Sequence, residues 1–210
     1  MSVGSSRRRP ARAAHLGPER RRPQVLDAAL KLTVAHGLRS VNMESVADAV
    51  GVTKPAVYAC FASREDLLAA LLTREEQRLV AGVLSALPAE LDLRDPERLM
   101  VEGFRALLTV VESHADSWRL VLASETDPAV AQRYREARKL VAGRVAFLMN
   151  DWLRRRRIRD AARRSPVLVE AFMSLCESAI HAMLDNPRDW TADELGAYYG
   201  RLALGAFQNA

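Results

Sequence analysis

Apolar residues recur at intervals of three and four along almost the whole chain beyond residue 22 of its 210 residues. This spacing places them on one face of a helix and predicts helices from end to end. The sequence has no sustained alternation of apolar and polar residues and no Asn-Gly or Asp-Gly hairpin turn. We therefore predict an all-α fold of nine helices, three short ones followed by six larger ones.

Glycine, proline and short polar residues divide this pattern into separate helices. The first three predicted helices span residues 23–36, 43–50 and 53–60, and Gly37 and Gly51 end the first two. The N-cap residues expected for the second and third helices are Asn42 and Thr53. The larger helices are predicted to begin after Ser63, at Pro96, near Ser117, after Pro128, at Pro166 and after Thr191, with Asp66 and Glu194 completing two capping boxes.

The strongest local signal lies in residues 43–62, where two short helices meet across Gly51. Ala47 is small enough for the helices to cross closely, Gly51 suits the positive φ of the turn, and Val57 fills the space between the helices. A unit of this shape presents its second helix to the major groove of DNA. The same residues would also suit the ordinary packing of a helical bundle, so this pattern alone leaves both interpretations open.

The residues around this motif resemble the tetracycline-repressor (TetR) family of bacterial transcriptional regulators. The matching segment runs from Leu26 to Leu72 and contains the run VADAVGVTKPAVYACFASREDLL. The departures from the family's pattern are Pro55, Ala59, Cys60 and Arg64. The resemblance implies a helix-turn-helix DNA-binding domain over residues 23–70 and a helical effector-binding and dimerisation domain over residues 71–210.

By this resemblance the recognition helix opens with Thr53, whose hydroxyl and neighbouring free N–H groups suit a phosphate oxygen. Lys54 would reach either a guanine edge or a phosphate, and Tyr58 would hydrogen-bond a phosphate one turn later. Arg64 would hold the flanking DNA backbone, and the alanines would touch thymine methyl groups. The implied DNA contacts are Asn42, Met43, Thr53, Lys54, Pro55, Ala56, Tyr58, Ala59 and Arg64.

The resemblance also implies that the C-terminal helices enclose a pocket for an effector. Aromatic and Met side chains give such a pocket an apolar, adaptable lining. The candidate pocket residues are Phe104, Trp118, Phe147, Met173 and His181, although each would also serve in an ordinary core. We expect a small hydrophobic effector and no cofactor.

The last two predicted helices have more apolar surface than one helix face needs. Small residues at three- and four-residue spacing let helices approach closely, and in the TetR family two such helices from each subunit form a four-helix bundle. The candidate residues of this homodimer interface are Phe172, Ile180, Gly196, Gly200, Ala203 and Phe207. A core within one chain is the alternative. A two-fold dimer would read a palindromic operator with two recognition helices.

Charge is concentrated in two segments. The formal net charge is +5, but residues 1–22 alone have seven Arg and one Glu. These residues lack apolar periodicity and are predicted to be disordered, either as a solvated leader or as an arm that adds salt-dependent affinity for DNA. The second block, residues 154–164, has seven Arg and one Asp and is interpreted as a solvated helix end.

Several classes of protein are disfavoured by what the sequence lacks. The G-x-S-x-G, Walker and G-x-G-x-x-G motifs do not occur, and the four His and two Cys lack metal-ligand spacing. We therefore expect neither an enzyme nor a metal site. No apolar run approaches the length of about 18 residues that spans a membrane, no signal peptide is recognisable, and two cysteines fit a reducing cytosol.

The sequence thus predicts a cytoplasmic, ligand-responsive repressor with no membrane segment. As a homodimer it would bind double-stranded operator DNA and leave it when a small hydrophobic effector binds. The alternative hypothesis is a helical DNA-binding protein that is regulated by a protein partner or has no effector.

Overall fold

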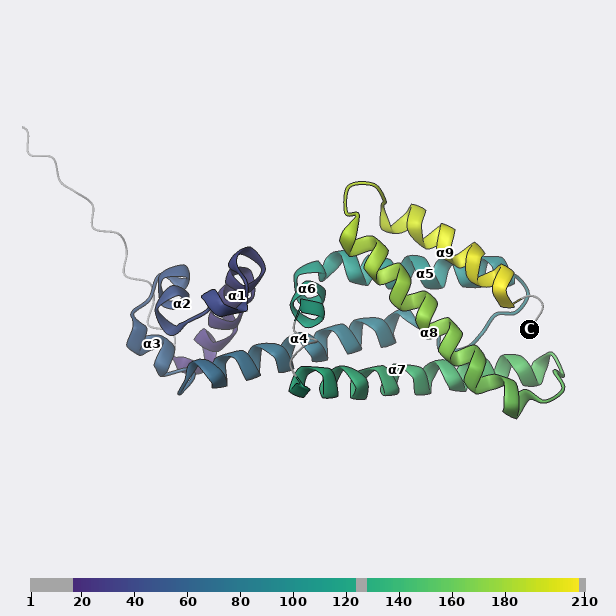
Figure 1. Cartoon of the computed structure of the whole chain (residues 1–210), viewed down its shortest axis with the longest axis horizontal. Coiled ribbons are helices and arrows are strands. Elements are labelled where there is room, and N and C mark those ends of the chain that lie inside the picture. Colours follow the sequence, from purple (N-terminus) through teal and green to yellow (C-terminus); the bar gives the residue numbers. More distant parts are fainter. Residues whose placement is uncertain (1–16, 124–127, 208–210) are drawn as a thin grey trace, which may run out of the picture.

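The structure is a computed structural model, and it describes residues 17–123 and 128–207. The described residues form nine α-helices and one short 3-10 helix and include no strand, so the all-α prediction is confirmed. Figure 1 shows a small domain of α1–α3 joined by the long helix α4 to a bundle that α4 forms with α5–α9. The helices are α1 (Pro18–His36), α2 (Met43–Val50), α3 (Lys54–Tyr58), α4 (Arg64–Ala86), α5 (Pro96–Ser113), α6 (Ala115–Ala123), α7 (Pro128–Arg155), α8 (Ala161–Asp185) and α9 (Ala192–Phe207), with the 3-10 helix at Leu38–Ser40.

The ends of α2 follow directly from the residues at its two ends. Asn42 Oδ1 accepts hydrogen bonds from the backbone N–H groups of Glu44 and Ser45, both at 2.9 Å. Ser45 Oγ accepts the backbone N–H of Asn42 at 3.0 Å, which completes a reciprocal capping box. At the other end Gly51 has a φ of 76°, a left-handed conformation that glycine adopts without steric cost. The predicted boundaries of this helix are confirmed.

The predicted capping box of α9 is also present. Thr191 Oγ1 accepts the backbone N–H of Glu194 at 3.2 Å, and Glu194 Oε2 accepts the backbone N–H of Thr191 at 3.1 Å. Thr191 Oγ1 also donates to Glu194 Oε2 at 2.8 Å, and this bond together with the one from the backbone N–H of Thr191 holds the pKa of Glu194 below its usual value. At the start of α4 the described residues form one half of the predicted box, in which Ser63 Oγ accepts the N–H of Asp66 at 3.0 Å.

Two helices begin earlier than the sequence pattern predicts. α1 begins at Pro18, so residues 18–22 are helical rather than disordered, and Pro23 lies inside the helix. α8 begins at Ala161, so Pro166 lies inside it rather than at its start. In each helix the proline is the sixth residue, so the helix continues through it without the one hydrogen bond that a backbone N–H would donate there. Residues 1–16 of the segment predicted to be disordered lie outside the described residues.

The third helix is shorter than predicted. α3 ends at Tyr58 rather than at residue 60, and the side chain of Thr53 makes no capping hydrogen bond although it occupies the N-cap position. Pro55 lies in the first turn of the helix, as predicted. Within the described residues the Thr53 hydroxyl is therefore not used to cap α3.

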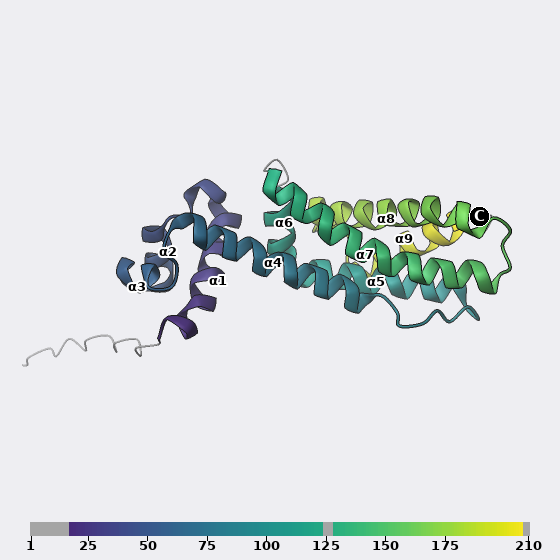
Figure 2. The same cartoon turned by 90° about the horizontal axis from the view of Figure 1, so that it is seen from below.

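The buried apolar residues form two cores, and α6 contributes to both. Leu120 is packed in the N-terminal core with residues such as Val25, Val57 and Leu71. Trp118 and Val121, on the same helix, belong to the core of the C-terminal bundle. α6 packs against both α1 and α4, and Figure 2 shows it at the junction of the two parts. A displacement of α6 would therefore disturb the packing of the N-terminal domain.

Helices α5 and α9 pack closely against each other within one chain. A Cβ added to Gly196 would lie 2.7 Å from Arg105 Cα, and one added to Gly200 would lie 2.5 Å from Val101 Cα. The predicted interface residues that are instead buried inside the chain are Ile180, Gly196, Gly200, Ala203 and Phe207. Phe172 is half-buried and packs on the same core. The five buried residues are not favoured as dimer contacts, because their small or apolar surfaces are already covered by α5 and its neighbours, whereas an interface role of Phe172 stays a prediction.

Candidate DNA-binding surface and ligand cavity

The short helix α3 is held by its inner face and presents its outer face to solvent. Val57, Cys60 and Phe61 are buried in the N-terminal core. Thr53, Lys54, Pro55, Tyr58 and Ala59 are exposed, and Ala56 is half-buried. Because the exposed residues include the N-terminus of the helix, a hydroxyl, an ammonium and a phenol face outward together. Groups of this kind bind phosphate oxygens and base edges.

The second helix adds less to this surface than predicted. Met43 is 4% exposed and packs in the N-terminal core, so the prediction that it contacts DNA is wrong. Asn42 is exposed, but its side-chain oxygen is used to cap α2. Lys54 Nζ lies 3.6 Å from Glu44 Oε2, and both side chains are largely exposed. This pair is weak, so Lys54 is able to exchange its carboxylate partner for a phosphate.

Arg64 has an internal role that the sequence did not indicate. Its Nε donates to the carbonyl of Val41 at 2.6 Å, and one terminal nitrogen donates to the carbonyl of Leu38 at 2.9 Å. These bonds tie the start of α4 to the turn that precedes α2. The predicted contact of Arg64 with the DNA backbone is therefore not favoured, because its guanidinium is engaged by backbone carbonyls.

Arg22, the last residue of the basic N-terminal segment, is also engaged within the chain. Its guanidinium lies 4.2 Å from the centroid of the Phe61 ring and donates to the carbonyl of Cys60 at 2.5 Å. Arg22 therefore stabilises the helix-turn-helix unit rather than a mobile arm. Burial raises the pKa of the Cys60 thiol, an effect that the charges of Arg21 and Arg22 partly oppose. This thiol is more protonated at neutral pH than a free cysteine, which favours a structural role.

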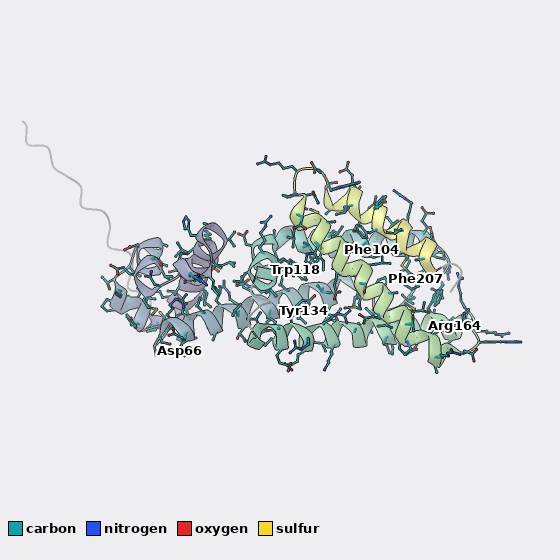
Figure 3. All side chains as sticks on the ribbon, viewed as in Figure 1. Asp66, Phe104, Trp118, Tyr134, Arg164 and Phe207 are labelled. Carbon is teal, nitrogen blue, oxygen red and sulfur yellow. The ribbon has the colours of Figure 1, made fainter. Side chains whose placement is uncertain are left out.

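An apolar cavity of about 210 Å³ lies in the C-terminal bundle between α4, α5, α6, α7 and α8. Three of the five predicted pocket residues line it, namely Phe104, Trp118 and Met173. The other two do not: Phe147 is 63% exposed on α7, with Arg144 stacked 5.2 Å from its ring, and His181 is exposed on α8. Figure 3 shows Trp118 and Tyr134 at the end of the bundle nearest the N-terminal domain, with Phe104 farther along.

The charged residues at the cavity wall are paired with one another. Arg133 Nε lies 2.6 Å from Glu76 Oε2. Arg138 forms ion pairs with Glu170 and Glu177, both at 2.6 Å. These hydrogen bonds raise the pKa of Arg138 and lower that of Glu170. Between α4, α7 and α8 the cavity is therefore framed by two arginines and three carboxylates, so that every arginine of this group has a carboxylate partner and the net charge is negative.

A buried polar network links the cavity helices to the N-terminal domain, and sequence analysis missed it. Glu75 of α4 is fully buried and accepts hydrogen bonds from Ser117 Oγ of α6 at 2.7 Å and from Arg74 Nε at 2.6 Å. Arg74 also reaches Asp27 of α1 at 2.7 Å. The signal for this site was a charged residue on the apolar face of α4, four residues after Leu71 and four before Leu79. The Glu75 carboxylate thereby joins α4 to α6, and Arg74 extends the network to α1.

Helices α8 and α9 leave a face of apolar and small polar residues uncovered. α8 includes an 18-residue window of mean hydropathy 1.5, of which 28% is buried within the chain. A helix of this length and composition could cross a membrane, but a core or interface helix passes the same test. On α8 the exposed stripe consists of Val167, Ala171, Ser174, Ser178 and His181, and on α9 the exposed apolar residues include Tyr198 and Leu202. Such a patch indicates a surface that another protein covers.

A short exposed helix on its own small core, joined by a long helix to a separate bundle, is the architecture of a helix-turn-helix protein with a C-terminal helical domain. Residues 25–71 match the sequence profile of the bacterial regulatory proteins of the tetR family. This match identifies residues 25–71 as a DNA-binding domain of the tetR family, and the fold of the chain is the one seen in TetR-like transcriptional regulators.

Two relatives with similar sequences are also described as HTH-type transcriptional regulators. The chain is 34% identical over 128 residues to the HTH-type transcriptional activator FasR of Mycolicibacterium smegmatis. This match covers 60% of this chain but only 57% of FasR. It is 26% identical over 191 residues to an uncharacterised HTH-type transcriptional regulator of Mycobacterium tuberculosis. That match covers 89% of this chain and 76% of the relative.

Solved structures share the fold over nearly the whole chain. A TetR-like regulator from Rhodococcus sp. RHA1 superposes with a TM-score of 0.69 at 20% identity, covering 90% of this chain and 97% of the other. The fatty acid degradation regulator FadR from Bacillus halodurans superposes with a TM-score of 0.66 at 16% identity, covering 90% and 96%. At these identities the comparison establishes the arrangement of the helices and not the ligand.

Proposed function

We propose that the chain is a cytoplasmic repressor that binds a palindromic operator as a homodimer and leaves it when a small hydrophobic ligand enters the bundle. The observation that carries the DNA-binding part is the outward face of α3, where Thr53, Lys54 and Tyr58 are exposed together at the first turn and the next. The match of residues 25–71 to the tetR family supports the same function. Binding-site selection from random duplexes with the purified protein tests it, and an inverted repeat is the expected result.

Lys54→Ala and Tyr58→Phe are each expected to weaken operator binding by about tenfold or more, because each removes one polar contact with DNA from both subunits. Stability should hardly change, since both side chains are exposed. Fluorescence anisotropy with the selected operator measures the affinity. Lys139→Ala on the exposed surface of α7 is the matched control and should bind like the wild type. Wild-type affinity in both α3 variants would refute the assignment of these contacts.

The proposed homodimer uses the uncovered face of α8 and α9 in place of the small-residue face predicted from the sequence. Val167→Glu and Leu202→Glu are each expected to raise the dimer dissociation constant by at least tenfold, because each would bury two unpaired charges, one from each subunit, in the interface. Val167 is 69% and Leu202 47% exposed in the single chain. Sedimentation equilibrium measures the effect.

Leu140→Glu is the matched control for these two variants. Leu140 is an apolar residue of α7 that is 57% exposed, outside the proposed interface. This variant should remain a dimer. If it dissociates while the α8 and α9 variants do not, the dimer is formed by α7 and the proposed interface is wrong.

The effector part of the proposal rests on the cavity and its place in the fold. The cavity is almost wholly apolar and is bounded by α4 and α6, the helices that also contact the N-terminal domain. A ligand that binds better to a conformation with displaced α4 or α6 would shift the dimer toward it and lower its affinity for DNA. One structural neighbour is a fatty acid degradation regulator, which favours a ligand with an alkyl chain.

Transcription in vitro from a promoter that overlaps the selected operator distinguishes the remaining alternatives. A repressor lowers transcription, and ligand restores it. An increase in transcription on adding the protein would instead indicate an activator. The relative FasR is described as a transcriptional activator. If the protein represses transcription but binds no ligand-like dye in its bundle, control by a protein partner, or the absence of an effector, is indicated.

A further inference from the structure

The cavity in the bundle is long and is polar at one end only. α4 lines it from Leu72 to Ala86, which is about 21 Å of helix. At the end nearest the N-terminal domain the lining includes Trp118, Tyr134 and the Arg133–Glu76 pair. At the other end it consists of apolar side chains such as Leu87, Pro88, Leu91, Leu93 and Trp152. This shape suits an elongated molecule with one polar end that lies toward α6.

Trp118 has a hydrogen-bond donor that the described part of the chain does not satisfy. The residue is 7% exposed and lines the cavity, and its indole Nε1 has no hydrogen-bond partner among the described residues. Buried N–H groups are almost always paired in folded proteins, and leaving one unpaired disfavours the state by about tenfold. Because Nε1 itself is buried, a ligand oxygen reaches it only when Trp118 or α6 shifts, and the hydrogen bond gained then favours the shifted conformation.

The charges around this donor indicate that the oxygen belongs to an uncharged group. The two arginines of the cavity wall, Arg133 and Arg138, are each bonded to carboxylates at 2.6 Å. Burial raises the pKa of the Cys176 thiol to about 12, so this lining residue is neutral at pH 7. An anionic ligand would have to break an ion pair to find a cation, whereas a carbonyl needs only the N–H of Trp118.

We propose that the effector is an elongated apolar molecule with an uncharged carbonyl-type oxygen, and that Trp118 Nε1 donates a hydrogen bond to this oxygen and so sets ligand specificity. This inference rests on the proposed function, since it identifies the ligand class of the same cavity. Trp118 directly follows Ser117, which is bonded to the buried carboxylate of Glu75. The ligand contact therefore lies beside the network that joins α6 to α4 and α1.

Displacement of a fluorescent apolar dye from the full-length protein tests this assignment with three probes of equal chain length. Methyl dodecanoate supplies a neutral carbonyl, dodecane has no acceptor, and dodecanoate has a charged one. We expect the ester to bind about tenfold more tightly than the alkane and at least as tightly as the anion. Tighter binding of dodecanoate than of the ester would overturn the uncharged class.

Trp118→Phe removes the donor and keeps an aromatic ring in the cavity wall. The ester should lose about tenfold in affinity, while dodecane should change little. The matched control is Trp152→Phe, which alters a half-buried Trp at the apolar end of the same cavity and should affect both probes equally. An equal loss for both probes in Trp118→Phe would show that the ring only fills space.

A measurement on the unmutated protein keeps the test independent of how the variants fold. The indole N–H proton resonance of Trp118, assigned among three tryptophans, should move downfield on adding methyl dodecanoate and not on adding dodecane. If both probes bind alike and this resonance does not distinguish them, the role of Trp118 is refuted while the effector proposal stands. If neither probe binds, the effector proposal and this inference both fail.

Discussion

Replacing Gly200 with alanine is expected to destabilise the fold by about 3 kcal/mol. The added methyl group would lie 2.5 Å from Val101 Cα and 2.7 Å from Val101 N. These are backbone atoms, so no side-chain rotation relieves the clash, and α5 and α9 must move apart. The separation would also loosen Ala203 and Phe207, which are buried on the same side of α9. Urea denaturation measures the free energy of unfolding.

Gly205 on the same helix provides the control. A Cβ there would meet nothing within 4 Å among the described residues, and alanine favours a helix over glycine by about 1 kcal/mol. Gly205→Ala should therefore leave stability unchanged or raise it. If Gly200→Ala is no less stable than Gly205→Ala, the close packing of α5 against α9 is not a source of stability.

The parts of the fold that sequence predicted correctly depend on local chemistry. The bounds of α2 follow from a side chain that caps its first turn and from a glycine with positive φ that ends it. Both effects act within three residues, so they can be recognised from the sequence alone. The helix starts at Pro18 and Ala161 were missed because the prolines that follow them also suit a first turn.

The predictions from sequence that were wrong concern residues whose role depends on which other helix packs against them. The spacing of Gly196 and Gly200 shows that another helix comes close, but not whether that helix belongs to the same chain. The same ambiguity applies to Phe147 and His181, since an apolar helix has no mark that separates the cavity side from the outside. Family resemblance placed Met43 and Arg64 near DNA, but it does not give the direction of a side chain, and both point into the chain.

The correctly predicted cavity residue Trp118 and the missed residue Glu75 belong to one arrangement. Glu75 is bonded to Ser117, the neighbour of Trp118, and through Arg74 it is connected to Asp27 of α1. Leu120 adds an apolar contact between α6 and the N-terminal core. A ligand that moves α6 therefore acts on polar and apolar contacts of the DNA-binding domain at once, without a flexible linker between them.

Replacing Glu75 with glutamine is expected to destabilise the protein by about 3 kcal/mol, because it leaves the largely buried Arg74 guanidinium without its buried counter-charge. Glu75 is fully buried, and Arg74 Nε lies 2.6 Å from its carboxylate. Thermal and urea unfolding measure the loss. The variant should also respond less to ligand, since α6 would be tied less firmly to α4; titration of operator binding with and without ligand measures this response.

Glu76→Gln separates the effect of burial from that of charge. Glu76 is the next residue of α4 and pairs with Arg133 at 2.6 Å, but both side chains are about one-third exposed, so the pair should contribute no more than about 1 kcal/mol. If Glu76→Gln were as destabilising as Glu75→Gln, the buried network would contribute no more to stability than the partly exposed pair. If Glu75→Gln lowered stability but left the response of operator binding to ligand intact, Glu75 would support the fold alone, and the apolar contact of Leu120 would be left as the connection between ligand and DNA.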